Sequence, residues 1–203
     1  LGNEAVTISD TTIAASSLNT IDAHTTDVVN AATVTTITGA AADINTVYTA
    51  GSAGTITGLG NEAVTLSDTT IAVSSINTLD AYTTGLVNAA TVTTLTGTAA
   101  EIIHLFNGPG LQAIAGLGNE DITVTGTITV AQFNTIAAST TGVITATVAE
   151  GDMTTLAGIT ESGNALTITV TDASVAASDL NTLDGRTTVA VDAATVTTLT
   201  GTT

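Results

Sequence analysis

The stretch Leu1-Gly2-Asn3-Glu4-Ala5-Val6-Thr7 decides the fold, because the chain repeats it. It returns unchanged at residues 59–65, and residues 117–123 keep its first four positions and its final threonine. A fixed internal period, here 58 residues in a chain of 203, is typical of proteins that stack one structural unit on the next. We therefore expect a repeat array with a core that continues from unit to unit.

The array divides into four blocks. Block 1 spans residues 1–58, block 2 spans 59–116, block 3 spans 117–162 and block 4 spans 163–203. Block 3 is the most divergent, and block 4 is partial. Natural repeat arrays cover their terminal units with atypical polar repeats, and neither end of this sequence carries one. We therefore expect the chain to be a fragment of a longer protein.

The charge balance limits the possible partners. Arg186 is the single basic residue against 18 acidic residues, which gives a formal net charge of −17. One cation cannot neutralise a row of phosphates, so binding to nucleic acid or to an anionic membrane is excluded. Cysteine is absent, which excludes disulfides and thiolate metal sites. Cations are the electrostatic partners that this composition favours.

Threonine and valine alternate in a second repeated stretch. Residues 31–39 read Ala-Ala-Thr-Val-Thr-Thr-Ile-Thr-Gly, and residues 89–97 and 193–201 repeat them with leucine in place of isoleucine. This alternation predicts a strand with one buried face, and the final glycine predicts a corner. With 43% hydrophobic and 9% charged residues the chain is not disordered. We expect parallel strands in register, about 4.8 Å apart, so that valine lies on valine.

A short helical motif recurs seven times. It has two apolar residues three positions apart, often with Asn-Thr between them, and its copies begin at Leu18, Ile44, Ile76, Ile102, Phe133, Met153 and Leu180. The steps between copies run from 20 to 32 residues, which predicts one coil per step. Thr98 and Glu101 have the spacing of a capping box, so one or two helical turns are predicted there. Gly185 is predicted to close such a turn in the left-handed conformation.

These signals together predict a mainly β fold. We expect a parallel β-solenoid (β-helix) of about seven coils of 20–32 residues, with short helical turns at one corner. Pro109 is the only proline, and we expect it to form a turn that interrupts the stacking, because proline cannot join a central strand.

The segments Thr98-Ala99-Ala100-Glu101-Ile102 and Leu180-Asn181-Thr182-Leu183-Asp184-Gly185-Arg186-Thr187 carry a resemblance. They resemble the T-A-A-E-L-N-x-L-D-G-x-T repeats of phage tail-fibre proteins and of giant surface proteins of marine bacteria, notably cyanobacteria. The sequence departs from that pattern at Phe106 and at Ala137. The resemblance implies an extracellular, cell-surface or virion fibre whose partners are neighbouring repeats of the same fibre. Single-chain coils and an intertwined homotrimer both remain open.

Catalytic chemistry has little support in the sequence. His24 and His104 are the only imidazoles, and they fall at non-equivalent positions of the repeat. His24 aligns with Tyr82 and Arg186, so this position accepts unrelated side chains. No known catalytic or cofactor motif is present. We predict a protein that is not an enzyme, with no catalytic residues and no organic cofactor.

Acidic residues recur at two corners and raise the possibility of calcium binding. Stacked coils would gather oxygen ligands, of which calcium takes six to eight, and the candidates are Asp22, Asp80, Asp184 and Asp192. The alternative is that Asn and Asp close turns through bonds to the backbone. In that case an internal amide ladder is expected from Asn19, Asn45, Asn77, Asn134 and Asn181. The alternative is favoured, because no known calcium-binding loop or nonapeptide repeat is present.

Threonine triplets of the form Thr-x-Thr raise the possibility of ice binding. Regular threonine ranks on a flat solenoid face resemble those of some antifreeze proteins, and the candidates are Thr33, Thr35, Thr91, Thr93, Thr195 and Thr197. The triplet is clear only in alternate coils, which argues against a dedicated ice binder.

The sequence thus favours a non-enzymatic structural repeat module. It would be a stalk or spacer of a long extracellular or virion-attached fibre or adhesin. The alternatives are an ice-binding module and a calcium-dependent surface-layer or adhesin repeat.

Overall fold

The computed structural model describes residues 2–108 and 114–201. The chain forms two compact units. Unit 1 consists of Leu1–Thr93 and Gly108–Leu117, and unit 2 of Thr94–Asn107 and Gly118–Thr203. The turn predicted at Pro109 lies outside the described residues. No helix in the described part of the chain is long and apolar enough to span a membrane.

The secondary structure is mixed, so the prediction of a mainly β fold is wrong. Helices hold 31% of the described residues and strands 28%, and all the sheets are parallel, which makes the protein α/β rather than a β-solenoid or β-helix. The Thr/Val runs form strands of only two to five residues, apart from β11 with eight. The segments between them are rich in Ala, Leu and Ile, and they form complete helices where we predicted only corner turns.

Each coil contributes one helix. The seven helices of the described residues are α1 (Ala15–Ala23), α2 (Ala41–Ala53), α3 (Val73–Tyr82), α4 (Ala99–Asn107), α5 (Val130–Ala137), α6 (Met153–Leu156) and α7 (Ala177–Asp184). Helix α2 buries Ala41, Ile44, Val47 and Tyr48, a spacing that places all four on one face. The apolar pairs that we read as corner motifs are therefore the buried faces of helices.

The helix ends follow the sequence in one respect and depart from it in another. The capping box at Thr98 and Glu101 is confirmed: each backbone N–H is bonded by the other's side chain, at 2.8 and 3.3 Å. Helix α5 has the same arrangement at Thr129 and Gln132. The left-handed conformation predicted for Gly185 is wrong, because its φ is −68°. It is Gly54, with a φ of 83°, that ends α2 in this way.

Unit 1 contains two parallel sheets. In the first, β1 (Val6–Thr7), β3 (Val29–Asn30) and β5 (Ile56–Thr57) lie in that order. In the second, the order is β2 (Thr12–Ala14), β4 (Thr36–Gly39), β6 (Ala63–Leu66), β8 (Val87–Asn88) and β10 (Ile114–Ala115). Another strand, β7 (Thr70–Ala72), precedes α3. Each successive coil therefore adds the next strand.

Unit 2 follows the same rule. The strands β9 (Thr94–Gly97), β11 (Asp121–Ile128), β12 (Ile144–Val148) and β13 (Ala165–Thr167) pair in sequence order. A separate parallel pair joins β14 (Ser174–Ala176) to β15 (Thr198–Thr200).

The strand register in unit 1 does not follow the sequence repeat. Ile13 pairs with Ile37, which pairs in turn with Val64, so two coils take 51 residues although the repeat takes 58. Equivalent residues therefore drift around the coils. Val6 lies in the three-stranded sheet, whereas Val64, its counterpart one repeat later, lies in the five-stranded sheet.

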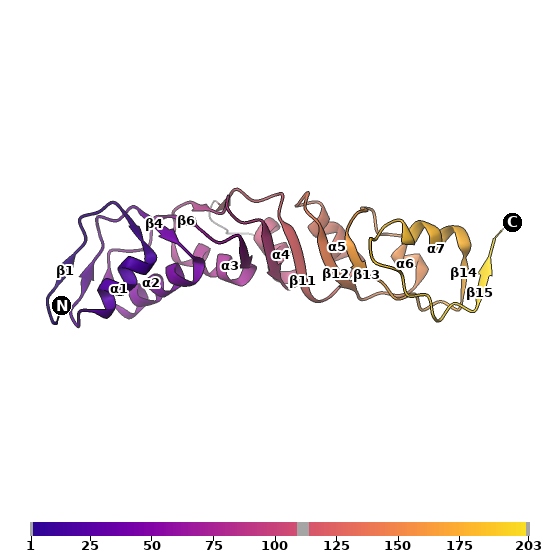
Figure 1. The fold of residues 1–203 in the computed structure, drawn as a ribbon, viewed down its shortest axis with the longest axis horizontal. Coiled ribbons are helices and arrows are strands. Elements are labelled where there is room, and N and C mark those ends of the chain that lie inside the picture. Colours follow the sequence, from indigo (N-terminus) through magenta and orange to yellow (C-terminus); the bar gives the residue numbers. More distant parts are fainter. Residues whose placement is uncertain (1, 109–113, 202–203) are drawn as a thin grey trace. The chain divides into compact units, whose positions relative to one another are not determined.

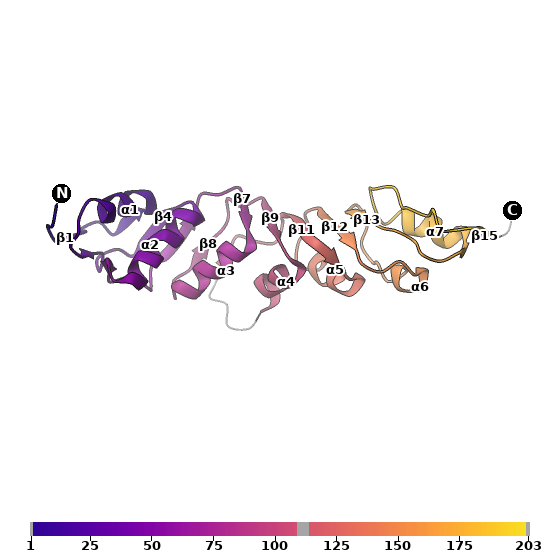
Figure 2. The ribbon, with the colours of Figure 1, turned by 90° about the horizontal axis from the view of Figure 1, so that it is seen from below.

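The core lies between sheets and helices. Leu18, Ile44 and Ile76, the first residues of three helical motifs, are completely buried in α1, α2 and α3. These helices lie side by side in unit 1 (Figures 1 and 2), as do α4 and α5 in unit 2. One continuous apolar layer within each unit follows from this arrangement.

Candidate functional site

Two glutamates are fully buried, which is rare for this residue type. Glu62 and Glu120 each have 0% exposure, and each is the fourth residue of the repeat-start motif Leu-Gly-Asn-Glu. Because a buried carboxyl group costs free energy unless it is hydrogen-bonded, its surroundings are the first place to look for a function.

The carboxyl group of Glu62 is held by its own loop and by a tyrosine. The backbone N–H of Gly60 donates to both carboxyl oxygens, at 3.2 and 2.9 Å. Tyr48 Oη, from helix α2, donates to Oε2 at 3.1 Å. These bonds fix the loop before β6 to the helix of the preceding coil.

Tyr48 also stacks on the other tyrosine of the chain. The ring centroids of Tyr48 and Tyr82 lie 5.5 Å apart with an interplanar angle of 14°, within the range of favourable stacked pairs. Burial raises the pKa of Tyr48 above its ordinary value, and the neighbouring Glu62 acts in the same direction. Tyr48 is therefore a proton donor and a packing residue.

The backbone of Glu62 is bonded to the following coil. Thr83 is 2% exposed, and its Oγ1 donates to the carbonyl oxygen of Glu62 at 2.7 Å and accepts from the N–H of Gly85 at 3.0 Å. A Cβ atom at Gly85 would lie 2.2 Å from the same carbonyl oxygen. Position 85 therefore requires glycine for steric reasons. We call Glu62, Thr83 and Gly85 the Glu–Thr junction of unit 1.

Unit 2 contains a second Glu–Thr junction, formed by Glu120, Thr140 and Gly142. Thr140 Oγ1 donates to the Glu120 carbonyl oxygen at 2.7 Å, and the N–H of Gly142 donates to Thr140 Oγ1 at 3.0 Å. A Cβ atom at Gly142 would again lie 2.2 Å from the carbonyl oxygen. The two junctions share one geometry although they belong to different units.

The two junctions differ at the carboxyl group. Glu120 Oε2 accepts from the N–H of Gly118 at 2.8 Å, but Oε1 is buried without a hydrogen-bond partner. Phe106 occupies the eighth position of α4, as Tyr48 occupies the eighth position of α2. The hydroxyl group that serves Glu62 is therefore missing from the equivalent helix position in unit 2.

The first and last copies of the junction are modified. Glu4, in the first coil, is exposed, but it keeps the bonds from Gly2 N and from Thr25 Oγ1, both 2.6 Å. The bond from the Gly2 backbone N–H lowers the pKa of Glu4. In block 4 Asn164 takes the place of the glutamate and accepts the N–H of Ile144 at 2.7 Å. The junction thus recurs in every block.

The surroundings of the junctions favour a structural role over catalysis. A cavity of about 330 Å³ in unit 1 is lined by Tyr48, Tyr82 and Gly60 among others, but not by Glu62. A cavity of about 590 Å³ in unit 2 is lined mainly by small and hydroxyl side chains, with Glu161 as its charged residue. His24 and His104 are both exposed and line neither cavity.

The four proposed calcium ligands are not brought together. Asp22 accepts a bond of 3.2 Å from Thr55, Asp80 is buried in α3, and Asp184 ends α7. Within residues 2–108 and 114–201, no three His, Cys, Asp or Glu side chains form a group that could hold a metal ion. The turn-closing bonds of the alternative are present, since the following backbone is bonded by the side chains of Asn30, Asn88 and Asp192.

The expected asparagine ladder takes another form. Asn19 and Asn134 donate to backbone carbonyl oxygens of the next coil, those of Asp43 at 2.9 Å and Gly158 at 2.8 Å. The Oδ1 atoms of Asn45 and Asn77 are buried without a partner, and Asn181 is exposed. Amide-to-backbone bonds between coils thus replace the predicted amide-to-amide ladder at Asn19 and Asn134.

The six candidate ice-binding threonines are all exposed. Five of them donate their hydroxyl protons to carbonyl oxygens of the preceding coil, and these are Thr35, Thr91, Thr93, Thr195 and Thr197. Because of the register drift, Thr35 lies beside Thr11 rather than in line with Thr93. The triplets of unit 1 therefore do not form one continuous rank.

Sequence reasoning missed the Glu–Thr junctions. The repeat-start motif was recognised as a mark of periodicity, but its glutamate was not considered as a buried group. The available signal was that glutamate returns at the fourth position in three copies of a chain with few charged residues. Comparison of the chain with known protein families, curated proteins and solved structures found no match.

Proposed function

We propose that the chain is a non-enzymatic structural repeat module, a stalk or spacer of an extracellular or virion-attached fibre. The observation that carries the proposal is the recurrence of the Glu–Thr junction, in which the fully buried groups of each copy bond neighbouring coils. In an enzyme, we would expect the unusual buried groups to occur once and to face an accessible cavity.

The composition supports the same proposal. A single basic residue leaves one site for trypsin-like proteases, and parallel pairing leaves few long exposed loops for other proteases. A net charge of −17 opposes aggregation at the high local concentrations of an assembled fibre. Each of these properties suits a protein exposed outside the cell.

Neither alternative has an observation in its favour. Ice binding requires free, regularly spaced hydroxyl groups, and most of the candidate hydroxyls are engaged within the chain. Calcium binding requires grouped oxygen ligands, and the described residues contain no such group of acidic side chains.

Immunogold electron microscopy tests the proposal directly. Antibodies raised against the 203-residue chain should label thin fibres on the surface of the source cell or virion. Pre-immune serum and antibody pre-absorbed with the chain are the controls, and both should leave the fibres unlabelled. Labelling confined to the cell interior would contradict the proposal.

A further inference from the structure

The last strand of unit 2 exposes a residue that is buried in equivalent strands. Leu199 in β15 is 61% exposed, whereas Ile37 in β4 and Leu95 in β9 are 0% exposed. All three occupy the same place in the stretch Ala-Ala-Thr-Val-Thr-Thr-x-Thr-Gly. The difference arises because β15 pairs with β14 alone among the described strands, so its second edge is open.

An apolar hollow lies beside this open edge. A cavity of about 300 Å³ is lined by Leu180, Val191, Ala193 and Leu199 together with Ala177 and two polar residues of α7. Apolar side chains at the centre with polar residues at the margin are typical of protein–protein contact surfaces. We call these residues of unit 2 the β15 face.

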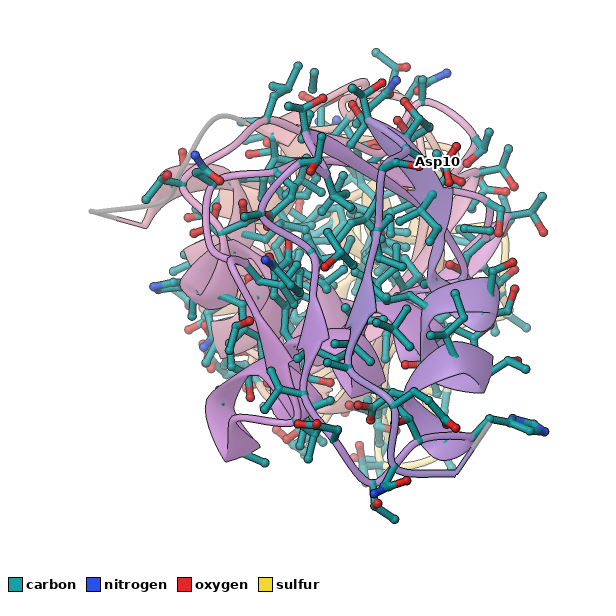
Figure 3. The ribbon with its side chains drawn as sticks, turned by 90° about the vertical axis from the view of Figure 1, so that its left-hand side faces the viewer. Asp10 is labelled. Atoms are coloured by element: carbon teal, nitrogen blue, oxygen red, sulfur yellow. The ribbon has the colours of Figure 1, made fainter. Side chains whose placement is uncertain are left out.

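Unit 1 has the complementary open edge. Strand β1 pairs with β3 alone among the described strands. Val6 in β1 remains half-buried, while its repeat counterpart Val64 in β6 is 0% exposed. Figure 3 looks onto this end of unit 1, which we call the β1 edge, and labels Asp10 there.

The partner that fits both edges is already present inside the chain. Strand β4 pairs with β6 in unit 1, with Thr36, Ile37 and Thr38 opposite Ala63, Val64 and Thr65. Residues 31–39 match residues 193–201 at eight of nine positions, and residues 59–65 are identical to residues 1–7. The two halves of one well-formed interface thus occur again, unpaired, at the β15 face and the β1 edge.

We propose that two copies of this chain bind head to tail, with the β1 edge of one copy added to β15 of the other. The expected register is that of β4 and β6, which places Val6 opposite Leu199 and Thr7 opposite Thr200. The proposal does not rest on the function proposed above. Because the two surfaces are different, further copies can add in the same way and form an open filament.

The charges make the association dependent on salt. The first coil carries Glu4, Asp10, Asp22 and Asp27, and the last carries Asp179, Asp184 and Asp192 with Arg186. These like charges repel at low ionic strength and are screened over about 8 Å at physiological salt. Association should therefore strengthen as sodium chloride is added, opposite to the behaviour of an interface held by ion pairs.

Sedimentation velocity over a range of protein and salt concentrations tests the proposal. The unmodified chain should form dimers and larger species as either concentration rises. Leu199→Lys should weaken association at least tenfold, since it places a charge where an apolar side chain would be buried. Leu86→Lys is the matched control, because Leu86 is also exposed, at 45%, but lies in an internal coil. It should associate as the unmodified chain does.

Disulfide trapping tests the register, and the natural chain has no cysteine to interfere. Opposite residues of paired strands lie close enough for a disulfide. A mixture of the Thr7→Cys and Thr200→Cys chains should therefore form a crosslinked heterodimer on mild oxidation. The control mixture of Thr7→Cys with Thr125→Cys, an exposed position inside β11, should not. Proteins that stay monomeric at high salt, insensitivity to Leu199→Lys, or equal crosslinking in both mixtures would overturn the proposal.

Discussion

Tyr48 Oη donates a hydrogen bond of 3.1 Å to Glu62 Oε2, and both side chains are buried. The bond joins a helix of one coil to the loop that opens the next sequence block. In unit 2 the equivalent helix position holds Phe106, and Glu120 Oε1 has no partner. The chain therefore contains the same junction with and without its tyrosine.

Exchanging the two aromatic residues should change stability in opposite directions. Tyr48→Phe should lower the free energy of unfolding by about 1 kcal/mol, because it leaves a buried acceptor with one bond fewer. Phe106→Tyr should raise it by about the same amount by supplying a donor for Glu120. Urea unfolding followed by circular dichroism measures both. Tyr82→Phe is the control and should have little effect, since no hydrogen bond of its hydroxyl is described. A loss of stability in Phe106→Tyr would contradict the equivalence of the junctions.

Glycine at the junctions is required by close contact with a backbone carbonyl. Gly85→Ala and Gly142→Ala should each destabilise the protein by about 3 kcal/mol or more, since the new Cβ would lie 2.2 Å from an oxygen. Gly185→Ala is the control, because its φ of −68° suits alanine and its nearest neighbour is at 3.5 Å. It should raise stability by about 0.4–1 kcal/mol. Thermal unfolding of the three variants ranks them, and equal effects would exclude the steric explanation.

The sequence predicted the repeat, the parallel pairing and the capping box at Thr98, because these depend on local pattern. It did not predict the amount of helix. The Asn-Thr motifs were short enough to be read as corners, and only packing of Leu18, Ile44 and Ile76 against one another's coils stabilises full helices. The drift of 51 against 58 residues was also hidden, since it depends on how coils close in space.

The candidate sites were harder to predict for a related reason. Asp22, Asp80 and Asp184 share a sequence position, and we assumed that a shared position implies proximity. The register drift separates repeat counterparts, as Val6 and Val64 demonstrate by lying in different sheets. The buried Glu62 was missed because glutamate normally indicates an exposed position.

Alkaline pH should destabilise the protein through Tyr48. An unfolded tyrosine loses its proton near its ordinary pKa of 10.0, but burial raises the pKa of Tyr48 in the folded state. The folded chain therefore holds a proton that the unfolded chain has lost, and this contribution to stability is complete below pH 10 and declines above it. Urea midpoints measured from pH 8 to 11.5 should fall above about pH 10. Tyr48→Phe should flatten this dependence and Tyr82→Phe should not; identical curves would contradict the assignment.

Removal of divalent cations should leave stability unchanged. The described acidic residues form no group that could hold a metal ion, and a ligand stabilises a fold only if it binds the folded state preferentially. The melting temperature should be the same with excess chelator and with calcium, once the ionic strength is matched with sodium chloride. Matching is essential, because a chain of net charge −17 is stabilised by any screening cation. A melting temperature that rises with calcium beyond the matched sodium sample would instead support a specific site.

Asp68 and Asp10 offer the sharpest test of how coils stabilise one another. Asp68 Oδ2 accepts the backbone N–H of Ala41 at 2.8 Å, so a side chain of one coil caps the helix of the preceding coil, whose own N-cap residue Ala40 makes no side-chain bond. Asp68→Ala should therefore lower the free energy of unfolding by about 1 kcal/mol. Asp10 is its counterpart one repeat earlier, at the end of unit 1 (Figure 3), and no hydrogen bond of its carboxyl group is described. Asp10→Ala should leave stability nearly unchanged in dilute solution. Equal losses in the two variants would show that the aspartate acts within its own coil and not as a cap for the preceding one.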